Sequence, residues 1–463
     1  MGRHRFLAFT AFTAFVWLAA SGMTDGSTAP RPPIFADLAD SARALPPEFA
    51  ADVLFRIVDA PKVADAAWKR EVLEDAFQLA GSAQQPFARR NWTGWPVSPL
   101  DKAYAQGLDA CTLQCKAVHG MLAIDYKRAR EMFGEMPPPQ IPRLTCEDSL
   151  VYDVSIFYAT AGDVAARAFN MKETDDEKPF HFLQRYAAEV SSAAQVAPIA
   201  HMLAGASVKP AQFEALVDSF AGGLQLLAGD DRSFSAIVLG DADGAIADLQ
   251  AACARKKVNA QPLLEAWRAY TARQFSGARC ADAAARVTGG DIKAASVDGK
   301  ARPAAPCDSP QCRQLAAQST SLVMAPNGYG FTPEQKATAD WAAKLRQYLA
   351  ALGDWKDDDN PVDYFQNKSR FYGDLFYVAP DGPDRDLLLS TMLTWLQQNG
   401  YRREHPAEWF YPVNMLLIHA FADTAGMKTT IRELRRAPDP VIALYAQLEE
   451  LLPRAPENTI GLL

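Results

Sequence analysis

The chain has 463 residues, of which 49% are hydrophobic and 22% are charged. This composition is typical of a globular protein, and it excludes wholesale disorder. The formal net charge of −8 argues against a nucleic-acid partner, because an acidic surface repels phosphate backbones and the sequence contains no compensating basic stripe.

The first 22 residues have the pattern of a secretory signal peptide. Arg3 and Arg5 precede an apolar run over residues 6–20, and small residues at 20–22 offer a cleavage site. Cleavage there removes two arginines and no acidic residue, so the net charge of the mature chain becomes −10. Later apolar runs are shorter than the roughly 20 residues that span a bilayer. We therefore expect a periplasmic or extracellular protein without a transmembrane span in its mature part.

Helix signals recur through the next part of the chain. Phe49, Val53 and Ile57 follow one another at four-residue steps, which is the apolar stripe of an amphipathic helix. Asp243 is placed to cap the start of a later helix. The predicted helices of this N-terminal domain, residues 23–286, cover 46–58, 72–80, 103–121, 126–133, 146–169, 182–203, 210–228, 245–254 and 262–275.

A change in composition divides the chain. Residues 287–330 are rich in Gly, Pro, Ser and Ala and lack helical periodicity, which predicts a linker or a long surface excursion. Thr332, Pro333 and Gln335 then begin a helix to about residue 353 with a capping box. The C-terminal domain, residues 331–463, has further predicted helices over 363–377, 384–398, 407–425, 429–436 and 440–452.

These elements predict an all-α fold. Successive helices with short connections are typical of an irregular α-solenoid or an α/α-packed globule. The chain has no repeat of fixed period with matching anchor residues, which argues against a regular repeat array.

The seven cysteines permit disulfides after export, and their odd number leaves at least one thiol unpaired. Cys253 and Cys280 bracket a predicted helical hairpin, so we expect them to pair. Cys307 and Cys312 flank a Pro-containing turn and form the second expected pair.

Cys111, Cys115 and His119 share one helical face at four-residue steps. They supply three possible zinc ligands, but a zinc site usually has four and no fourth is evident. We interpret the stripe as a packed helix face, and we expect neither a metal nor another cofactor.

Two polar groups in the C-terminal domain are candidates for a surface site. Asp357 and Asp359 belong to an acidic cluster that could offer oxygen ligands to calcium, but its spacing does not match the helix–loop–helix calcium motif. His405, Glu408 and Trp409 surround a proline that is typical of a helix start, and they do not form the zinc-protease pattern.

Aromatic residues are dense over 364–377 and recur at Trp395 and 409–411. They could line a groove for sugars, with nearby acids acting on a glycosidic bond. The competing interpretation is that they form the core of packed helices.

Three segments, residues 44–49, 275–282 and 405–410, resemble uncharacterised exported helical proteins of high-GC bacteria, of the kind found in Acidobacteria. The resemblance implies export and an all-α fold, and it carries no activity.

The sequence leaves two functions open. The first is a helical binding or scaffolding protein of the cell envelope, with a protein, peptide or glycan ligand. The second is an all-helical glycan- or peptide-active hydrolase whose cleft lies in the C-terminal third.

Overall fold

The computed structural model describes most of the chain from Arg31 onward. The described residues are 31–84, 86–91, 99–145, 148, 150–276, 309–324, 331–336, 338–356, 361–376, 379, 382–399, 406–422 and 432–452. The predicted signal peptide lies outside them, so export stays a prediction. The described part of the chain is 73% helical, with 20 α-helices and one small sheet, which confirms the all-α class. In the described part of the chain, no helix is both long and apolar enough to cross a membrane.

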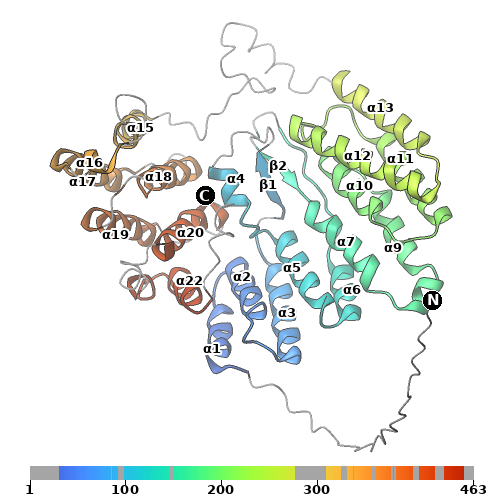
Figure 1. The fold of residues 1–463 in the computed structure, drawn as a ribbon, viewed down its shortest axis with the longest axis horizontal. Coiled ribbons are helices and arrows are strands. Elements are labelled where there is room, and N and C mark those ends of the chain that lie inside the picture. The colour runs from blue at the N-terminus through green and yellow to red at the C-terminus, as the bar shows by residue number, and fades with distance from the viewer. Residues whose placement is uncertain are drawn as a thin grey trace, which may run out of the picture.

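The helices of the N-terminal part lie in the centre and on the right of Figure 1. They are α1 (Pro33–Ala42), α2 (Pro47–Val58), α3 (Ala66–Ala80), α4 (Pro99–Tyr104), α5 (Ala110–Leu122), α6 (Tyr126–Glu135), α7 (Ser155–Arg167), α8 (Met171–Asp175), α9 (Lys178–Ala187), α10 (Val196–Ala204), α11 (Pro210–Leu226), α12 (Ala236–Lys256) and α13 (Gln261–Ser276). A short 3-10 helix, η1, spans Ala193–Gln195.

The helices of the C-terminal part lie on the left of the same view. They are α15 (Pro310–Val323), α16 (Pro333–Lys336), α17 (Ala339–Asp354), α18 (Pro361–Phe376), α19 (Pro383–Gln398), α20 (Pro406–Ala422) and α22 (Pro440–Leu451).

The single sheet joins β1 (Ala88–Asn91) to β2 (Leu150–Asp153). The strands are antiparallel, with Ala88 opposite Asp153 and Asn91 opposite Leu150. The prediction of one helix over residues 146–169 was therefore wrong at its start, because four residues pair with a strand that is distant in sequence. Local periodicity does not reveal such pairing.

Other predictions need correction as well. The helices predicted over 103–121 and 182–203 are each interrupted, because α4 ends at Tyr104 before α5 begins at Ala110, and α9 ends at Ala187 before α10 begins at Val196. The expected linker 287–330 contains α15, a helix whose first turn is capped by the Ser309 hydroxyl. The helix predicted from Thr332 divides into α16 and α17, because a second N-cap at Thr338 starts a new helix. Asp243 caps nothing: α12 runs uninterrupted past it, and its carboxylate accepts a hydrogen bond from the Trp267 indole at 3.1 Å.

The disulfide predictions have different outcomes. Cys253 is a fully buried free thiol, so the predicted bond to Cys280 is not formed. Cys253 packs among helices in the protein interior, and burial raises the pKa of its thiol. Cys312 is buried in α15, but Cys307 and Cys280 lie outside the described residues. The Cys307–Cys312 pair stays a prediction.

The helices pack side by side in rows, and neighbours within a row are often not consecutive in the chain. Helices α2, α3, α5, α7, α10 and α12 contact one another in succession, and α9, α11 and α13 form a second row. Helices α15, α17 and α19 contact one another in the same way, as do α18 and α20. Because α20 also contacts α4, and α22 contacts α1 and α2, the C-terminal helices adjoin the first helices of the chain (Figure 1).

An aromatic cluster holds these two parts together. The ring of Phe49 in α2 lies 5.9 Å from that of Trp409 and 5.0 Å from that of Phe410, both in α20. It also meets Tyr445 of α22 edge-on at 6.4 Å. All four side chains are buried. We call this cluster, together with the polar contacts beside it, the seam.

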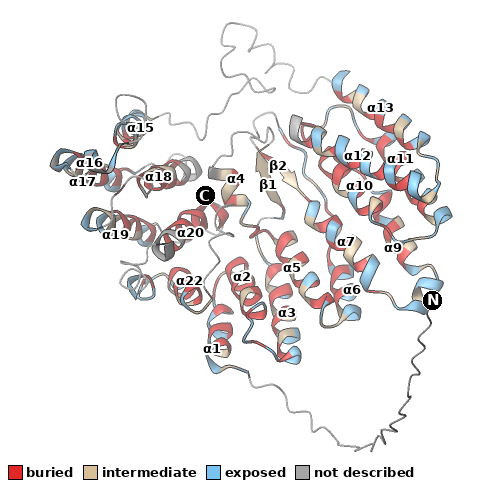
Figure 2. Cartoon of the chain, in the orientation of Figure 1, coloured by how far each residue is buried: buried red, intermediate tan, exposed pale blue. Residues whose placement is uncertain are grey.

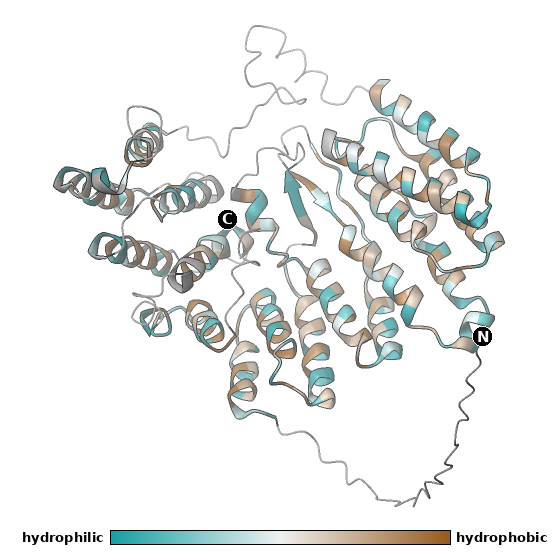
Figure 3. Cartoon of the chain, viewed as in Figure 1, coloured by the Kyte–Doolittle hydropathy of each residue, from teal (hydrophilic) through white to brown (hydrophobic). Residues whose placement is uncertain are grey.

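Polar contacts flank the aromatic rings of the seam. The Tyr445 hydroxyl donates to the Asp52 carboxylate at 2.7 Å, and Arg56 pairs with Glu449 at 2.8 Å. The Arg56 guanidinium also donates to the carbonyl of Leu452. One continuous hydrophobic core therefore runs through both predicted domains. Figures 2 and 3 show buried and apolar residues on the helix faces that meet neighbouring helices.

Truncation of the ring at the centre of the seam tests this arrangement. Phe49→Ala is expected to lower the free energy of unfolding by about 3–5 kcal/mol, because it leaves a cavity between α2, α20 and α22. The measurement is urea unfolding followed by circular dichroism. The matched control is Phe275→Ala, since Phe275 is 70% exposed and its loss should cost far less. Equal losses in the two variants would contradict the seam.

Candidate functional site

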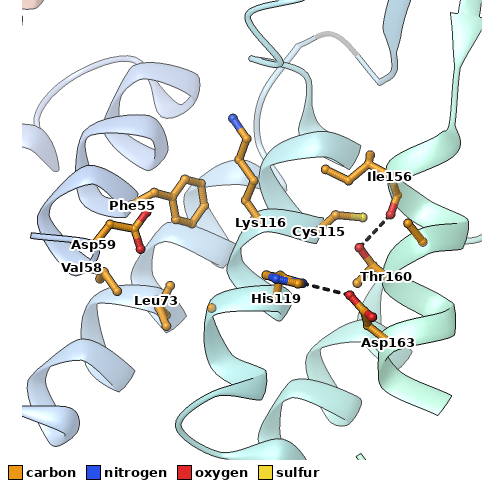
Figure 4. A pocket seen from close by; sticks show the side chains of 12 residues that line it. Phe55, Val58, Asp59, Leu73, Cys115, Lys116, His119, Ile156, Thr160 and Asp163 are labelled. Carbon is orange, nitrogen blue, oxygen red and sulfur yellow. Dashed lines mark hydrogen bonds and ion pairs between the residues drawn. The ribbon is translucent and has the colours of Figure 1, made fainter. Parts of the chain in front are cut away.

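A pocket of about 420 Å³ lies between α2, α3, α5 and α7. We call it the α5–α7 pocket. Figure 4 shows Phe55 and Leu73 on one side of it, and Ile156 on the opposite side. Its polar lining residues are Asp59, Cys115, Lys116, His119, Thr160 and Asp163. Apolar walls with a few polar groups are the usual make-up of a small-molecule or side-chain binding site.

Helix α5 supplies three of the polar residues of this pocket, Cys115, Lys116 and His119. The Asp109 side chain caps its first turn by accepting a hydrogen bond from the Thr112 amide at 2.8 Å. From that start, the helix brings Cys111, Cys115 and His119 to successive turns of one face. The three predicted residues therefore share one face of α5, and this face is directed toward α7 and not toward a fourth metal ligand.

Both cysteines of the stripe are free, and Cys115 is fully buried. A hydrogen bond between the two thiols, together with burial, raises the pKa of Cys111 well above its ordinary value. A thiol with a raised pKa stays protonated at neutral pH and is a poor nucleophile, so Cys111 is unreactive. Within the described ranges, no three His, Cys, Asp or Glu side chains are grouped to hold a metal ion.

Charged groups surround the mouth of the pocket. His119 Nδ1 lies 3.2 Å from a carboxylate oxygen of Asp163, so this pair bridges α5 and α7 (Figure 4). Both side chains are substantially exposed, at 60% and 43%, and they stay accessible to a ligand. The Thr160 hydroxyl proton is already engaged in a hydrogen bond within α7, to the carbonyl of Ile156 at 2.7 Å.

A second pocket, of about 430 Å³, lies on the other side of α7. We call it the α7–α10 pocket. Its walls include Leu183 of α9 and Met202 of α10, and His201 lies at its edge. Ala159 and Asp163 line both pockets, so the two adjoin along α7. His201 faces Asp248 of α12 at 3.8 Å, which repeats the histidine–aspartate pairing of the first pocket.

The structure does not support the predicted surface site in the C-terminal part. Glu408 and Trp409 are buried at 4% and 1% exposure. Glu408 accepts a hydrogen bond from the Tyr104 hydroxyl at 2.9 Å, and the Trp409 indole donates to the carbonyl of Asn399. The reason is that α20 is buried on all sides from residue 406 to 417. Asp357, Asp359 and His405 lie outside the described residues.

The described aromatic residues of the predicted cluster, within 364–372, at Trp395 and over 409–411, belong to the core, as the competing interpretation proposed. Tyr372 stacks on Trp395 with ring centres 5.4 Å apart, and Phe365 packs on the same indole at 5.5 Å. These rings are at most 3% exposed. The rings described in this cluster therefore offer no surface on which a sugar could stack.

Lys368 lies inside this aromatic cluster at 1% exposure. Its ammonium donates to the carbonyl of Trp355 and to the Tyr364 hydroxyl, both at 2.9 Å. Burial lowers the pKa of Lys368 to about 7, while Asp354 raises it and Lys356 lowers it further. No local pattern predicts the burial of Lys368, because a lysine in a helix is ordinarily on the solvated face.

The buried amine makes stability depend on pH. Between pH 7 and 10 the unfolded chain keeps a proton on Lys368 that the folded protein has released, so stability rises with pH. Lys368→Met should remove up to about 1.4 kcal/mol of that rise per pH unit. Urea unfolding at pH 7, 8 and 9 measures the slope. Lys344→Met, at a side chain that is 62% exposed, should leave the slope unchanged, and an unchanged slope in Lys368→Met would contradict the assignment.

No protein-family model matches the sequence, and comparisons with curated proteins and with solved structures give no match. The resemblance to exported helical proteins of high-GC bacteria therefore stays an expectation.

Sequence reasoning identified the stripe on α5 but missed the pockets. Phe55, Leu73 and Asp163 come from three other helices, and no local pattern shows that they face His119. The small residues Ala159 and Gly162 on α7 were an available signal. Small side chains in the middle of a helix leave room between neighbouring helices, but many small residues in this alanine-rich chain pack without forming a pocket.

Proposed function

We propose that the protein is an exported binding or scaffolding protein of the cell envelope and that its ligand enters the α5–α7 pocket. The observation that carries this proposal is the apolar pocket itself, with accessible charged groups at its mouth. Its volume of about 420 Å³ lies within the range of roughly 300–1,000 Å³ that is typical of ligand sites.

The way in which the helices pack supports a binding role. Rows of neighbouring helices, in which one helix contacts the next in space, are the arrangement expected for an irregular α-solenoid. Such arrays present extended surfaces on rigid elements, and rigid elements hold a site more firmly than loops do.

The alternative, a glycan- or peptide-active hydrolase with a cleft in the C-terminal third, loses its main support. It rested on aromatic residues that could stack on a sugar, but the described ones fill the core. Glu408, an acid near those aromatics, is buried and hydrogen-bonded to Tyr104.

A pocket-filling variant tests the binding proposal. Ile156 lines the α5–α7 pocket and is half-buried against the edge of the core, so the larger apolar side chain of Ile156→Trp should fill the space and keep an apolar contact there. The probes are N-acetyl dipeptide amides with leucine, phenylalanine or valine, added in a thermal-shift assay and then titrated by calorimetry. We expect at least one probe to bind the wild type and to lose tenfold or more in affinity in the variant.

The matched control for the pocket is Leu226→Trp. Leu226 is 86% exposed at the end of α11, and the same added bulk there should leave probe binding intact. Probe binding that is unaffected by Ile156→Trp, or absent from the wild type, would contradict the proposed pocket function.

Export has its own test. The small residues at 20–22 predict a mature chain that begins at Met23. Cell fractionation followed by intact-mass measurement should recover that species from the periplasm or the medium. Recovery of the chain from Met1 in the cytosol would contradict export and leave the pocket question open to the binding assay.

A further inference from the structure

The two pockets lie on opposite sides of one helix. Helix α7 separates them, and Ala159 and Asp163 line both. Neighbouring packed helices are about 8–10 Å apart, so the valleys on the two sides of α7 have roughly that spacing. A ligand that crosses α7 could therefore place one side chain in each pocket.

We propose that the two pockets together bind an extended peptide in the polyproline II conformation, with apolar side chains three residues apart in successive pockets. This inference rests on the proposed function and names its ligand class. A polyproline II helix has three residues per turn and rises about 3.1 Å per residue, so residues i and i+3 point the same way about 9 Å apart. Residues i and i+2 of a β-strand are only about 7 Å apart.

The polar groups around the pockets suit an extended backbone better than a helical one. Asp163 lines both pockets, its partner His119 lines the first, and His201 lines the second. The backbone of a polyproline II segment makes no internal hydrogen bonds, so its carbonyl and amide groups are free to pair with such side chains. An α-helical ligand satisfies its own backbone groups and gains little from them.

Charge complementarity points to a cationic peptide. Asp59 and Asp163 line the first pocket, and Asp248 faces His201 beside the second. Lys116 is the one Lys or Arg in the described lining of either pocket. The surplus of carboxylates, on a chain with a net charge of −8, favours a lysine or arginine in the ligand and disfavours an acidic residue.

The test uses fluorescein-labelled peptides of equal length in which one, two or three prolines separate two leucines. Each peptide is made with flanking lysines and, in a matched version, with flanking glutamates. Fluorescence anisotropy with the full mature chain measures affinity. We expect the two-proline spacer to bind tenfold or more tightly than the other spacers, and the lysine version to bind more tightly than the glutamate version at low salt.

A variant that fills the second pocket separates the contributions of the two pockets to peptide binding. Gly162 lines only the α7–α10 pocket, and a Cβ atom there would lie 3.6 Å from the Met202 side chain, an ordinary contact. Gly162→Leu should therefore fold and fill that pocket. It should remove the preference for the two-proline spacer and leave weak binding through the first pocket. Gly134→Leu in α6, where a Cβ atom meets nothing within 4 Å, is the matched control and should keep the preference.

Each other outcome overturns this inference in a recognisable way. Equal binding of all spacers by the wild type, or an unchanged preference in Gly162→Leu, would show that one pocket acts alone. Tighter binding by an α-helical peptide with leucines seven residues apart would replace the extended ligand with a helical one. In these cases the proposed function stands if Ile156→Trp still weakens dipeptide binding, and it fails if that variant changes nothing.

Discussion

The contact between Phe49 and the rings of Trp409, Phe410 and Tyr445 is the constraint on which the rest of the structure depends. These residues are far apart in sequence, so their contact closes a very long stretch of chain. Closure of a long loop costs entropy that grows only slowly with its length. Burial of four large aromatic side chains offsets this entropic cost, since each side chain contributes a few kcal/mol of stability. The contact also makes the first and last helices neighbours in space.

The polar groups of the seam show how its interior tolerates charge. Glu449 is buried, and the half-buried Arg56 pairs with it at 2.8 Å. A buried ion pair adds little net stability relative to apolar packing, but loss of one partner leaves an uncompensated charge and is strongly destabilising. The pair therefore specifies how α2 and α22 meet more than it strengthens their contact. The Tyr104–Glu408 hydrogen bond does the same for α4 and α20.

Burial distinguishes the polar residues that hold helices together from those that are accessible to a ligand. Glu408, Trp409 and Lys368 have the residue types of a site, but each is buried and hydrogen-bonded to the helices around it. The histidine–aspartate pairs at the two pockets are exposed and lie beside apolar space. Accessibility therefore locates the candidate site in the N-terminal part, on helices held rigidly by their neighbours.

The sequence by itself determined the helical class and most helix positions. Periodic apolar residues and N-caps are local signals, so α2, α11 and α13 lie close to where Phe49, Pro210 and Pro262 predicted them. It also showed that Cys111, Cys115 and His119 share one face. Two of its errors lie where packing with distant residues decides the local structure: β2 pairs with β1, and α15 lies within residues that composition assigned to a linker.

Only the tertiary structure decided which side chains meet. It buried Glu408 and Trp409 by surrounding α20 with other helices, and it placed Asp163 opposite His119. Burial and pocket formation depend on the packing of helices that are remote in the chain. A helical periodicity shows which face of a helix is apolar, but it does not show which other helix packs against that face. For this reason the class of fold could be predicted from the residues in order, whereas the site could not.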